Sequence, residues 1–242
     1  MNRIYGWKKD LPDHRDFIYK PKVYKLPTAV DLRYNCSPVE NQLTLGSCTA
    51  NALVGVLEYN EPKDSTFQDL SRLFIYYNER LIEHTVDSDA GAMIRDGIKA
   101  LAKAGVCPES EWPYDVSKFT IKPPISCYKD ALKRKITSYE RLDSLYAMKQ
   151  CLASGFPFAF GFTVYESFES EKVAKTGIVP YPKMNERAIG GHAVCVVGYD
   201  DKRKSFLVRN SWGEQWGISG YFWLPYLFVE NGLADDAWTI RK

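Results

Sequence analysis

The stretch NQLTLGSCTANALVGVLEYNEP, from Asn41 to Pro62, places a cysteine directly before a helical pattern. Apolar residues from Ala52 onward recur at the spacing of an α-helix, and Pro62 marks its end. Ser47 is a suitable N-cap, which puts Cys48 in the first helical turn. The partial positive charge of a helix N-terminus favours a thiolate there. Because free cysteines are usually small core residues, this stretch alone also allows a purely structural role for Cys48.

Length and composition set broad limits on what the chain can be. Its 242 residues are 45% hydrophobic, enough for one large domain or two small ones. The net charge is +2 with acids and bases interspersed, so no nucleic-acid or membrane partner is expected. The first ten residues, MNRIYGWKKD, lack the apolar segment of a secretory signal. A signal that had been trimmed would leave no trace, so the cellular compartment stays unassigned.

The cysteines and histidines do not form a metal-binding pattern. No CxxC pair occurs, and His14, His84 and His192 are far apart in the sequence, so we expect neither a metal site nor a cofactor. The cysteines are even in number, but a chain of this length does not depend on disulfides to fold. They lie at positions 36, 48, 107, 127, 151 and 195.

The character of the chain changes near its middle, which predicts an α+β protein of two lobes with a cleft between them. Residues 1–25 are a charged, turn-rich leader that we expect to lie extended on the surface. Residues 26–135 carry helical patterns and residues 136–242 carry strand patterns. The helices are expected within 48–61, 67–84, 90–106, with Gly105 as a C-cap, and 142–155; the strands are expected within 156–164, 177–182, 192–200, 205–212, 220–225 and 237–242.

The strand-rich half supplies partners for a reactive cysteine. His192 follows two glycines, where the backbone can bend and a ligand can approach closely. Asn210 ends a strand eighteen residues later. A thiolate needs an imidazole to take its proton, the imidazole needs an acceptor on its other nitrogen, and an oxyanion needs donors beside the cysteine. Cys48 could supply the thiolate, His192 the imidazole and Asn210 the acceptor that orients the imidazole. The Gln42 side-chain amide and the Cys48 backbone N–H could be the oxyanion donors. Taken singly, such a histidine is more often structural and such an asparagine a turn former.

Together these segments resemble the papain family of cysteine peptidases. The similarity rests on ordered motifs: LPTAVDLR (26–33), Gln42 with Gly46-Ser47-Cys48, WPY (112–114), GIVPYP (177–182), His192 with VGY (197–199), and NSWGEQWG (210–217). The resemblance implies a helical lobe facing an antiparallel, β-barrel-like lobe, and peptide hydrolysis through an acyl-thioester on Cys48. It also implies substrate contacts, by Gly91 through its backbone and by Gly191, Trp212 and Asp236. Trp212 would shield the His192–Asn210 contact, and Asp236 would pair with a basic side chain of the substrate.

Some family features are missing from the sequence. Thr49 follows the nucleophile where a tryptophan is usual, and Leu45 replaces a cysteine whose bridge partner is also absent from DSDAGAM (87–93). Cys127 falls near another bridge position, with Cys107 as a possible substitute partner. These losses fit a prokaryote-type branch of the family. Only 25 residues precede Leu26, too few for the usual helical pro-domain.

Three functions fit these residues. The first is an endopeptidase; the second is an exopeptidase or amidase that uses the same residues; the third is a catalytically inert peptide-binding protein. We expect a monomer that acts on proteins or peptides. The leader is apolar and aromatic at several positions, so it is expected either to reach the cleft as a vestigial inhibitor or to strap the surface.

Overall fold

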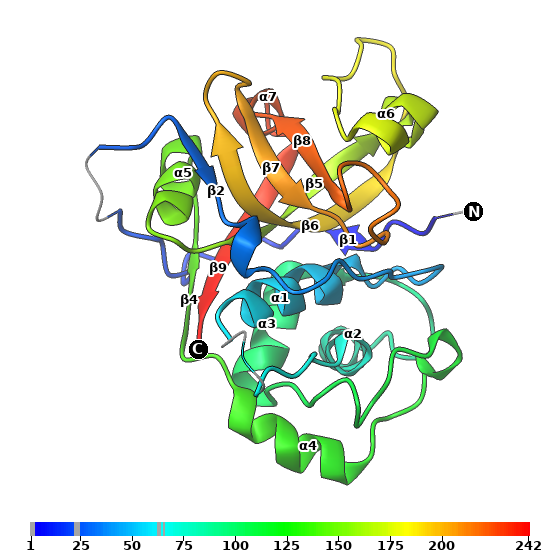
Figure 1. Cartoon of the computed structure of the whole chain (residues 1–242). Coiled ribbons are helices and arrows are strands. Elements are labelled where there is room, and N and C mark those ends of the chain that lie inside the picture. Colours follow the sequence, from blue (N-terminus) through cyan, green and yellow to red (C-terminus); the bar gives the residue numbers. More distant parts are fainter. Residues whose placement is uncertain (1–2, 22–24, 62–63, 65) are drawn as a thin grey trace.

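The chain folds into a helical lobe and a sheet lobe, with the N-terminal segment running between them (Figure 1). The computed structural model describes residues 3–21, 25–61, 64 and 66–242. Helices dominate the first half of the chain and antiparallel strands the second half. The α+β class predicted from the sequence is therefore confirmed.

The helical lobe is built around α1 (Cys48–Tyr59), which packs against α2 (Arg72–Ile82) and α3 (Ile94–Lys103) and also contacts the long strand β6 (Ala188–Asp200). Every residue of α1 is buried, since neighbours surround it on all sides. The short strand β3 (Ala92–Met93) leads into α3. The lobe is completed by α4 (Ile125–Ala131) and the 3₁₀ turns Arg33–Asn35, Val116–Lys118 and Leu132–Arg134.

The sheet lobe is a seven-stranded antiparallel sheet in the order β4-β9-β5-β6-β7-β8, with β2 also paired to β6. The strands that the structure describes form an open sheet, so the predicted barrel-like closure is replaced by edges at β4 and β8. The remaining strands are β2 (Ala29–Asp31), β4 (Ser138–Arg141), β5 (Phe158–Tyr165), β7 (Ser205–Arg209), β8 (Tyr221–Pro225) and β9 (Ala234–Arg241). Helices α5 (Leu145–Ala153), α6 (Glu171–Thr176) and α7 (Leu227–Glu230) and the 3₁₀ turn Glu166–Glu169 flank the sheet.

Local predictions near the helix ends had mixed outcomes. Gly105 follows α3 with φ +75° and donates its N–H to Leu101, as expected of a glycine that ends a helix. Ser47 precedes α1, but its side chain does not cap the helix; the hydroxyl instead pairs with the Tyr114 hydroxyl at 2.5 Å. Pro62, the expected end signal, lies outside the described residues.

The stretch 177–182 was expected to be a strand, and this prediction was wrong. Among the described residues it makes only an isolated bridge, between Ile178 and Trp223. Pro180 and Pro182 have no N–H to donate, so the segment cannot continue a hydrogen-bonded ladder.

Asp10 joins the leader to both lobes. Its carboxylate accepts the Arg95 N–H (3.1 Å) in the first turn of α3 and the Trp238 indole N–H (2.8 Å) on β9. Met93, the N-cap residue before α3, offers no side-chain cap, so Asp10 supplies the acceptor that the helix end lacks. Burial, with Asp236 beside it, raises the pKa of Asp10 to about 6. The leader is thus part of the folded core.

We predict that Asp10→Ala lowers the free energy of unfolding by about 2 kcal/mol, because two buried N–H donors lose their acceptor. Thermal unfolding of the full chain measures this. Asp13→Ala is the matched control: the Asp13 carboxylate bonds its exposed neighbour Arg15, and its loss should cost less than about 0.5 kcal/mol. Equal melting temperatures for the two variants would contradict the role given to Asp10.

Candidate active site

Cys48 begins α1 at the junction of the two lobes, where its side chain is fully buried. The backbone N–H groups of Ala193 on β6, Gly6 in the leader and Thr49 point at the sulfur and favour the thiolate. Burial outweighs them and raises the pKa of the Cys48 thiol to about 11. In this arrangement the sulfur carries its proton at neutral pH.

His192 lies on β6 and is held by Asn210 in a defined tautomer. Its Nε2 is 2.8 Å from Asn210 Oδ1, which also accepts the Ser211 N–H at 2.9 Å. Since Oδ1 is an acceptor, Nε2 must carry the proton. His192 Nδ1 is buried and has no hydrogen-bond partner among the described residues, so its lone pair is available to a thiol proton. Burial lowers the pKa of His192 to about 4 despite the Asn210 contact.

Gln42 is positioned by the segment that carries Asn210. Ser211 donates its hydroxyl to Gln42 Oε1 (2.6 Å), and the Gln42 backbone N–H bonds the Ser211 carbonyl (2.8 Å). Gln42 Nε2 donates one hydrogen to the Leu45 carbonyl at 2.8 Å. The amide carries a second hydrogen, which leaves one donor for a substrate oxygen.

Trp212 packs on the imidazole. The two rings are nearly parallel, with centroids 5.0 Å apart and 23° between their planes. The guanidinium of Arg3 lies 3.8 Å from the Trp212 ring centre and also pairs with Glu169 at 3.1 Å. Tyr5 contacts His192 edge-on and hydrogen-bonds the same glutamate. The leader therefore covers the imidazole side of the site.

The leader also covers Cys48. A Cβ on Gly6 would lie 1.7 Å from the Gly46 carbonyl oxygen, and a Cβ on Gly91 would lie 2.0 Å from the Gly6 oxygen. The Gly6 carbonyl accepts the Ala92 N–H at 2.8 Å, and Trp7–Lys8 (β1) pairs with Ala92–Met93 (β3) in parallel. Gly6 thus presents its N–H to Cys48, while its carbonyl oxygen is bonded to Ala92.

The structure brings seven of the eight predicted site residues to the cleft: Gln42, Cys48, His192, Asn210 and Trp212 at the centre, and Gly91 and Gly191 against the leader. Asp236, the eighth predicted residue, is the exception, because its carboxylate is already paired within the chain. Its buried carboxylate accepts hydrogen bonds from Arg141 (3.0 Å) and the Asp10 N–H (2.7 Å) of the same chain. Its pairing with a basic substrate stays a prediction.

Comparison with known proteins identifies the family. The model of the papain family of cysteine proteases matches residues 26–237. The chain belongs to this family. The crystal structure of xylellain, a cysteine protease from Xylella fastidiosa, is 46% identical, with a TM-score of 0.92 over 98% of this chain and 96% of that one.

Curated relatives agree with this assignment. An uncharacterised peptidase C1-like protein of Acanthamoeba polyphaga mimivirus is 44% identical, covering all of this chain and 88% of the relative. Cysteine proteinase 3 of Entamoeba histolytica is 27% identical, covering 90% of this chain and 69% of the relative. The predicted papain-like fold and peptidase class are therefore confirmed, and the chain is a papain-family cysteine protease.

This papain-family protease replaces one tryptophan of the usual pattern with a buried polar pair. Thr49, next to Cys48 in the chain, donates its hydroxyl to Glu79 at 2.5 Å. Burial raises the pKa of Glu79 well above its ordinary value, which favours a neutral carboxyl under Cys48. All six cysteines are free thiols, and burial and the neighbouring Cys127 raise the pKa of Cys107.

Sequence reasoning missed the residues that seat the leader and orient the amide. From the sequence, Ser211 is only part of a motif and Gly161 has no assigned role. Gly190 is identified there as a point of close approach, but the leader is not identified as what approaches it. A glycine inside an apolar strand can indicate that another backbone or ligand approaches closely. That signal was present at both positions.

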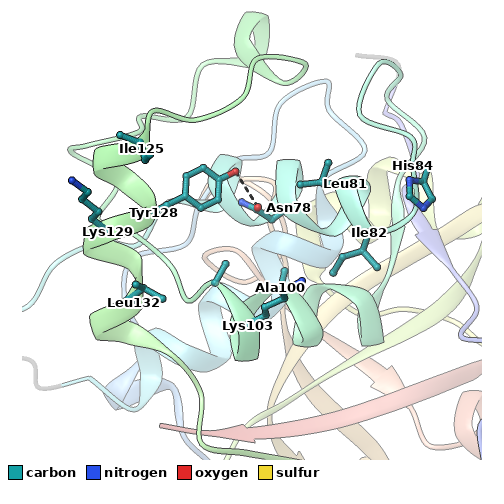
Figure 2. Close-up of a pocket in the computed structure, with 11 residues that line it drawn as sticks. Asn78, Leu81, Ile82, His84, Ala100, Lys103, Ile125, Tyr128, Lys129 and Leu132 are labelled. Carbon is teal, nitrogen blue, oxygen red and sulfur yellow. Dashed lines mark hydrogen bonds between the residues drawn. The ribbon is translucent and has the colours of Figure 1, made fainter.

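An apolar pocket of about 560 Å³ lies elsewhere on the protease, among α2, α3 and α4 (Figure 2). Leu81, Ile82, Ala100, Ile125 and Leu132 form much of its wall. It contains none of the predicted site residues, so we assign it no part in the chemistry.

The described part of the chain contains neither a membrane-spanning helix nor a metal-binding cluster. None of its helices has the length and apolar character needed to cross a bilayer. Within the same residues, no cluster of three or more histidine, cysteine or acidic side chains is arranged to hold a metal ion.

We predict that Gly6→Ala speeds alkylation of Cys48 by iodoacetamide, because the added methyl group cannot fit against Gly46 and the leader must lift. In the parent chain the labelling rate should rise only as pH approaches 11, since the thiolate is the reactive form. In Gly6→Ala, hydration of the site should move this rise to lower pH. Mass spectrometry of Cys48 measures both profiles, with Leu11→Ala, an exposed leader position, as control. Superimposable profiles would contradict a leader-imposed pKa shift.

Proposed function

We propose that this protease is an endopeptidase that acts through an acyl-thioester on Cys48. The observation that carries the proposal is the 2.8 Å contact between His192 Nε2 and Asn210 Oδ1, which directs an unprotonated Nδ1 away from the asparagine. An imidazole in this tautomer is a proton acceptor for a thiol, and the N–H groups around Cys48 stabilise the resulting thiolate.

The first half of the reaction transfers an acyl group to the sulfur. His192 Nδ1 takes the Cys48 proton, and the sulfur attacks the carbonyl carbon of the scissile bond. The negative charge that develops on the carbonyl oxygen is stabilised by the second Nε2 hydrogen of Gln42 and by the Cys48 N–H. Ser211 and Leu45 hold that amide in place beforehand. Collapse of the intermediate breaks the C–N bond, and the amine leaves with the proton from His192.

The second half returns the enzyme to its starting state. His192 accepts a proton from water, and the hydroxide attacks the thioester carbonyl. Collapse breaks the C–S bond, and the sulfur regains its proton from His192. Asn210 orients the imidazole in both halves through the same contact, while Trp212 packs on the ring and limits the access of water.

Binding on both sides of Cys48 favours an endopeptidase over an exopeptidase. The leader itself extends from Arg3 at Trp212, past Gly6 at Cys48, to Trp7 beyond Gly91. A path that holds five residues across the nucleophile has room for a peptide that continues in both directions. An inert peptide-binding protein is less favoured, because the Gln42–Ser211 and His192–Asn210 contacts are those that catalysis requires.

We further propose that the leader inhibits the enzyme in the same chain. It buries the sulfur and the imidazole, so the thiol pKa is raised and the imidazole pKa is lowered. Both shifts oppose proton transfer from Cys48 to His192. Activity then requires the leader to leave the cleft.

We predict that Cys48→Ala abolishes hydrolysis of a quenched fluorescent peptide and labelling by a thiol-directed epoxide. The change removes the atom that forms the acyl intermediate. The measurement is made in the full-length Gly6→Ala chain, with Cys151→Ala, a buried thiol on α5, as control. Residual turnover in Cys48→Ala at the level of the control would rule out the mechanism.

We predict that His192→Ala reduces kcat/KM more than Asn210→Ala does. His192 transfers the proton, a role typically contributing about 10²–10⁴-fold, whereas Asn210 only orients the ring. Steady-state kinetics of both variants in the Gly6→Ala chain test this order. Equal losses, or a larger loss for Asn210→Ala, would show that the roles are assigned wrongly.

A further inference from the structure

Exposed apolar side chains gather around the helical-lobe pocket, the hollow of about 560 Å³ among α2, α3 and α4 (Figure 2). Monomeric proteins seldom leave a large contiguous apolar surface uncovered, and a concave site of this volume with apolar walls is typical of small-molecule binding. The pocket therefore suits an apolar ligand. Its exposed wall residues are Leu81 (44% exposed), Ile82 (37%), Ile125 (75%) and Leu132 (58%).

The polar groups inside the helical-lobe pocket already have partners. Tyr128 on α4 donates its hydroxyl to Asn78 Oδ1 on α2 at 3.1 Å (Figure 2). The Asn78 amide donates to the Phe74 carbonyl at 2.7 Å. Because these groups are paired with each other and with the backbone, an alkyl chain can lie against them without breaking a hydrogen bond.

The charged residues of the pocket are all of one sign. Lys103, the last residue of α3, and Lys129 on α4 both line the pocket and are exposed. Neither makes an ion pair within the described part of the chain. His84, just after α2, adds an imidazole, and no aspartate or glutamate is among the described lining residues. The pocket thus offers an apolar body together with cations that have no counter-charge.

Acidic residues of the same helices are paired with other cations. Asp96 on α3 pairs with Lys99 at 2.7 Å, and Asp130 on α4 pairs with Arg134 at 2.6 Å. A lysine in the last turn of a helix also offsets the helix dipole, as both pocket lysines do. That role does not neutralise their charge, which is left for an anionic ligand.

We propose that the helical-lobe pocket binds a free long-chain fatty acid, with its alkyl chain among the apolar wall residues and its carboxylate at Lys103 and Lys129. A protein partner would have to cover about 800 Å² of this chain, far more than one hollow. A slender ligand with a single negative charge matches both the shape and the charge of the site. None of these residues belongs to the Cys48 site, so the inference is independent of the proposed function.

The experiment titrates the full-length chain with sodium laurate by isothermal calorimetry, below the concentration at which laurate forms micelles. Octanoate has the same carboxylate and four fewer methylenes, and dodecanol has the same chain length without the charge. Each buried methylene contributes about fourfold in affinity, so chain length and charge are tested separately.

Two variants probe the pocket, each with a matched control. Ile125→Glu places a negative charge on the pocket wall, and Ile121→Glu makes the same change at an exposed position (51%) that does not line the pocket. Lys103→Met with Lys129→Met removes the free cations. Lys99→Met with Lys133→Met removes as much charge from lysines that are already paired. All the substituted side chains are exposed, and thermal unfolding verifies that each chain is folded.

The expected result is one laurate per chain, bound about tenfold or more tightly than octanoate. Ile125→Glu should weaken laurate binding about tenfold or more, and the pocket double-lysine variant about threefold or more, with both controls unchanged. Absence of laurate binding, equal binding of dodecanol, or equal losses in the controls would overturn the proposal. Self-association, or binding to phosphatidylglycerol vesicles, that Ile125→Glu abolishes while laurate does not bind would assign the pocket to another partner and overturn it too.

Discussion

The meeting of three backbones beside Cys48 is the constraint on which the rest of the site depends. Gly6, Gly46 and Gly91 approach so closely that a single methyl group on Gly6 or Gly91 would lie 1.7–2.0 Å from a carbonyl atom of its neighbour. At this point the leader, the segment before α1 and the segment before α3 are in contact with one another. Cys48, the proposed nucleophile, begins α1 only two residues beyond Gly46, so a segment that lies beside Gly46 also lies close to the thiol.

The protonation states of Cys48 and His192 follow from their burial beneath this contact. With the leader in place, Cys48 and His192 are both fully buried, and burial raises the pKa of one and lowers that of the other. In the proposed mechanism, this exclusion of water disfavours the ionised thiol that the reaction needs. The tautomer of His192 is independent of this effect, because Asn210 fixes it from within the sheet lobe.

The leader also contributes to stability as it covers the site. Asp10 accepts hydrogen bonds from α3 in the helical lobe and from β9 in the sheet lobe. Arg3 and Tyr5 meet Glu169 at the other end of the cleft. The two roles weighed from the sequence, inhibitor and strap, are thus compatible. Residues 3–7 lie over the chemistry, whereas Asp10 bridges the lobes.

The sequence by itself determined the class of fold, the family and the order of the motifs. Helical patterns fall in the first half of the chain and strand patterns mainly in the second. Cys48, His192 and Asn210 each stand within a short motif that resembles one of the papain family. It did not determine the edges of the sheet, the hydroxyl partner of Ser47 or the partner of Asp236. These depend on pairings between residues far apart in the chain, such as Asp236 with Arg141 and with Asp10.

Only the tertiary structure decided where the leader goes and why the strand glycines are there. Aromatic residues in residues 1–25 indicated burial but not a place, since local pattern carries no information on which distant surface they meet. Gly161 and Gly191 become interpretable once Trp7 lies against both. The physical reason is that the space for Trp7 exists because Gly161 and Gly191 have no side chain. Trp7 itself comes from a segment more than 150 residues away in the chain.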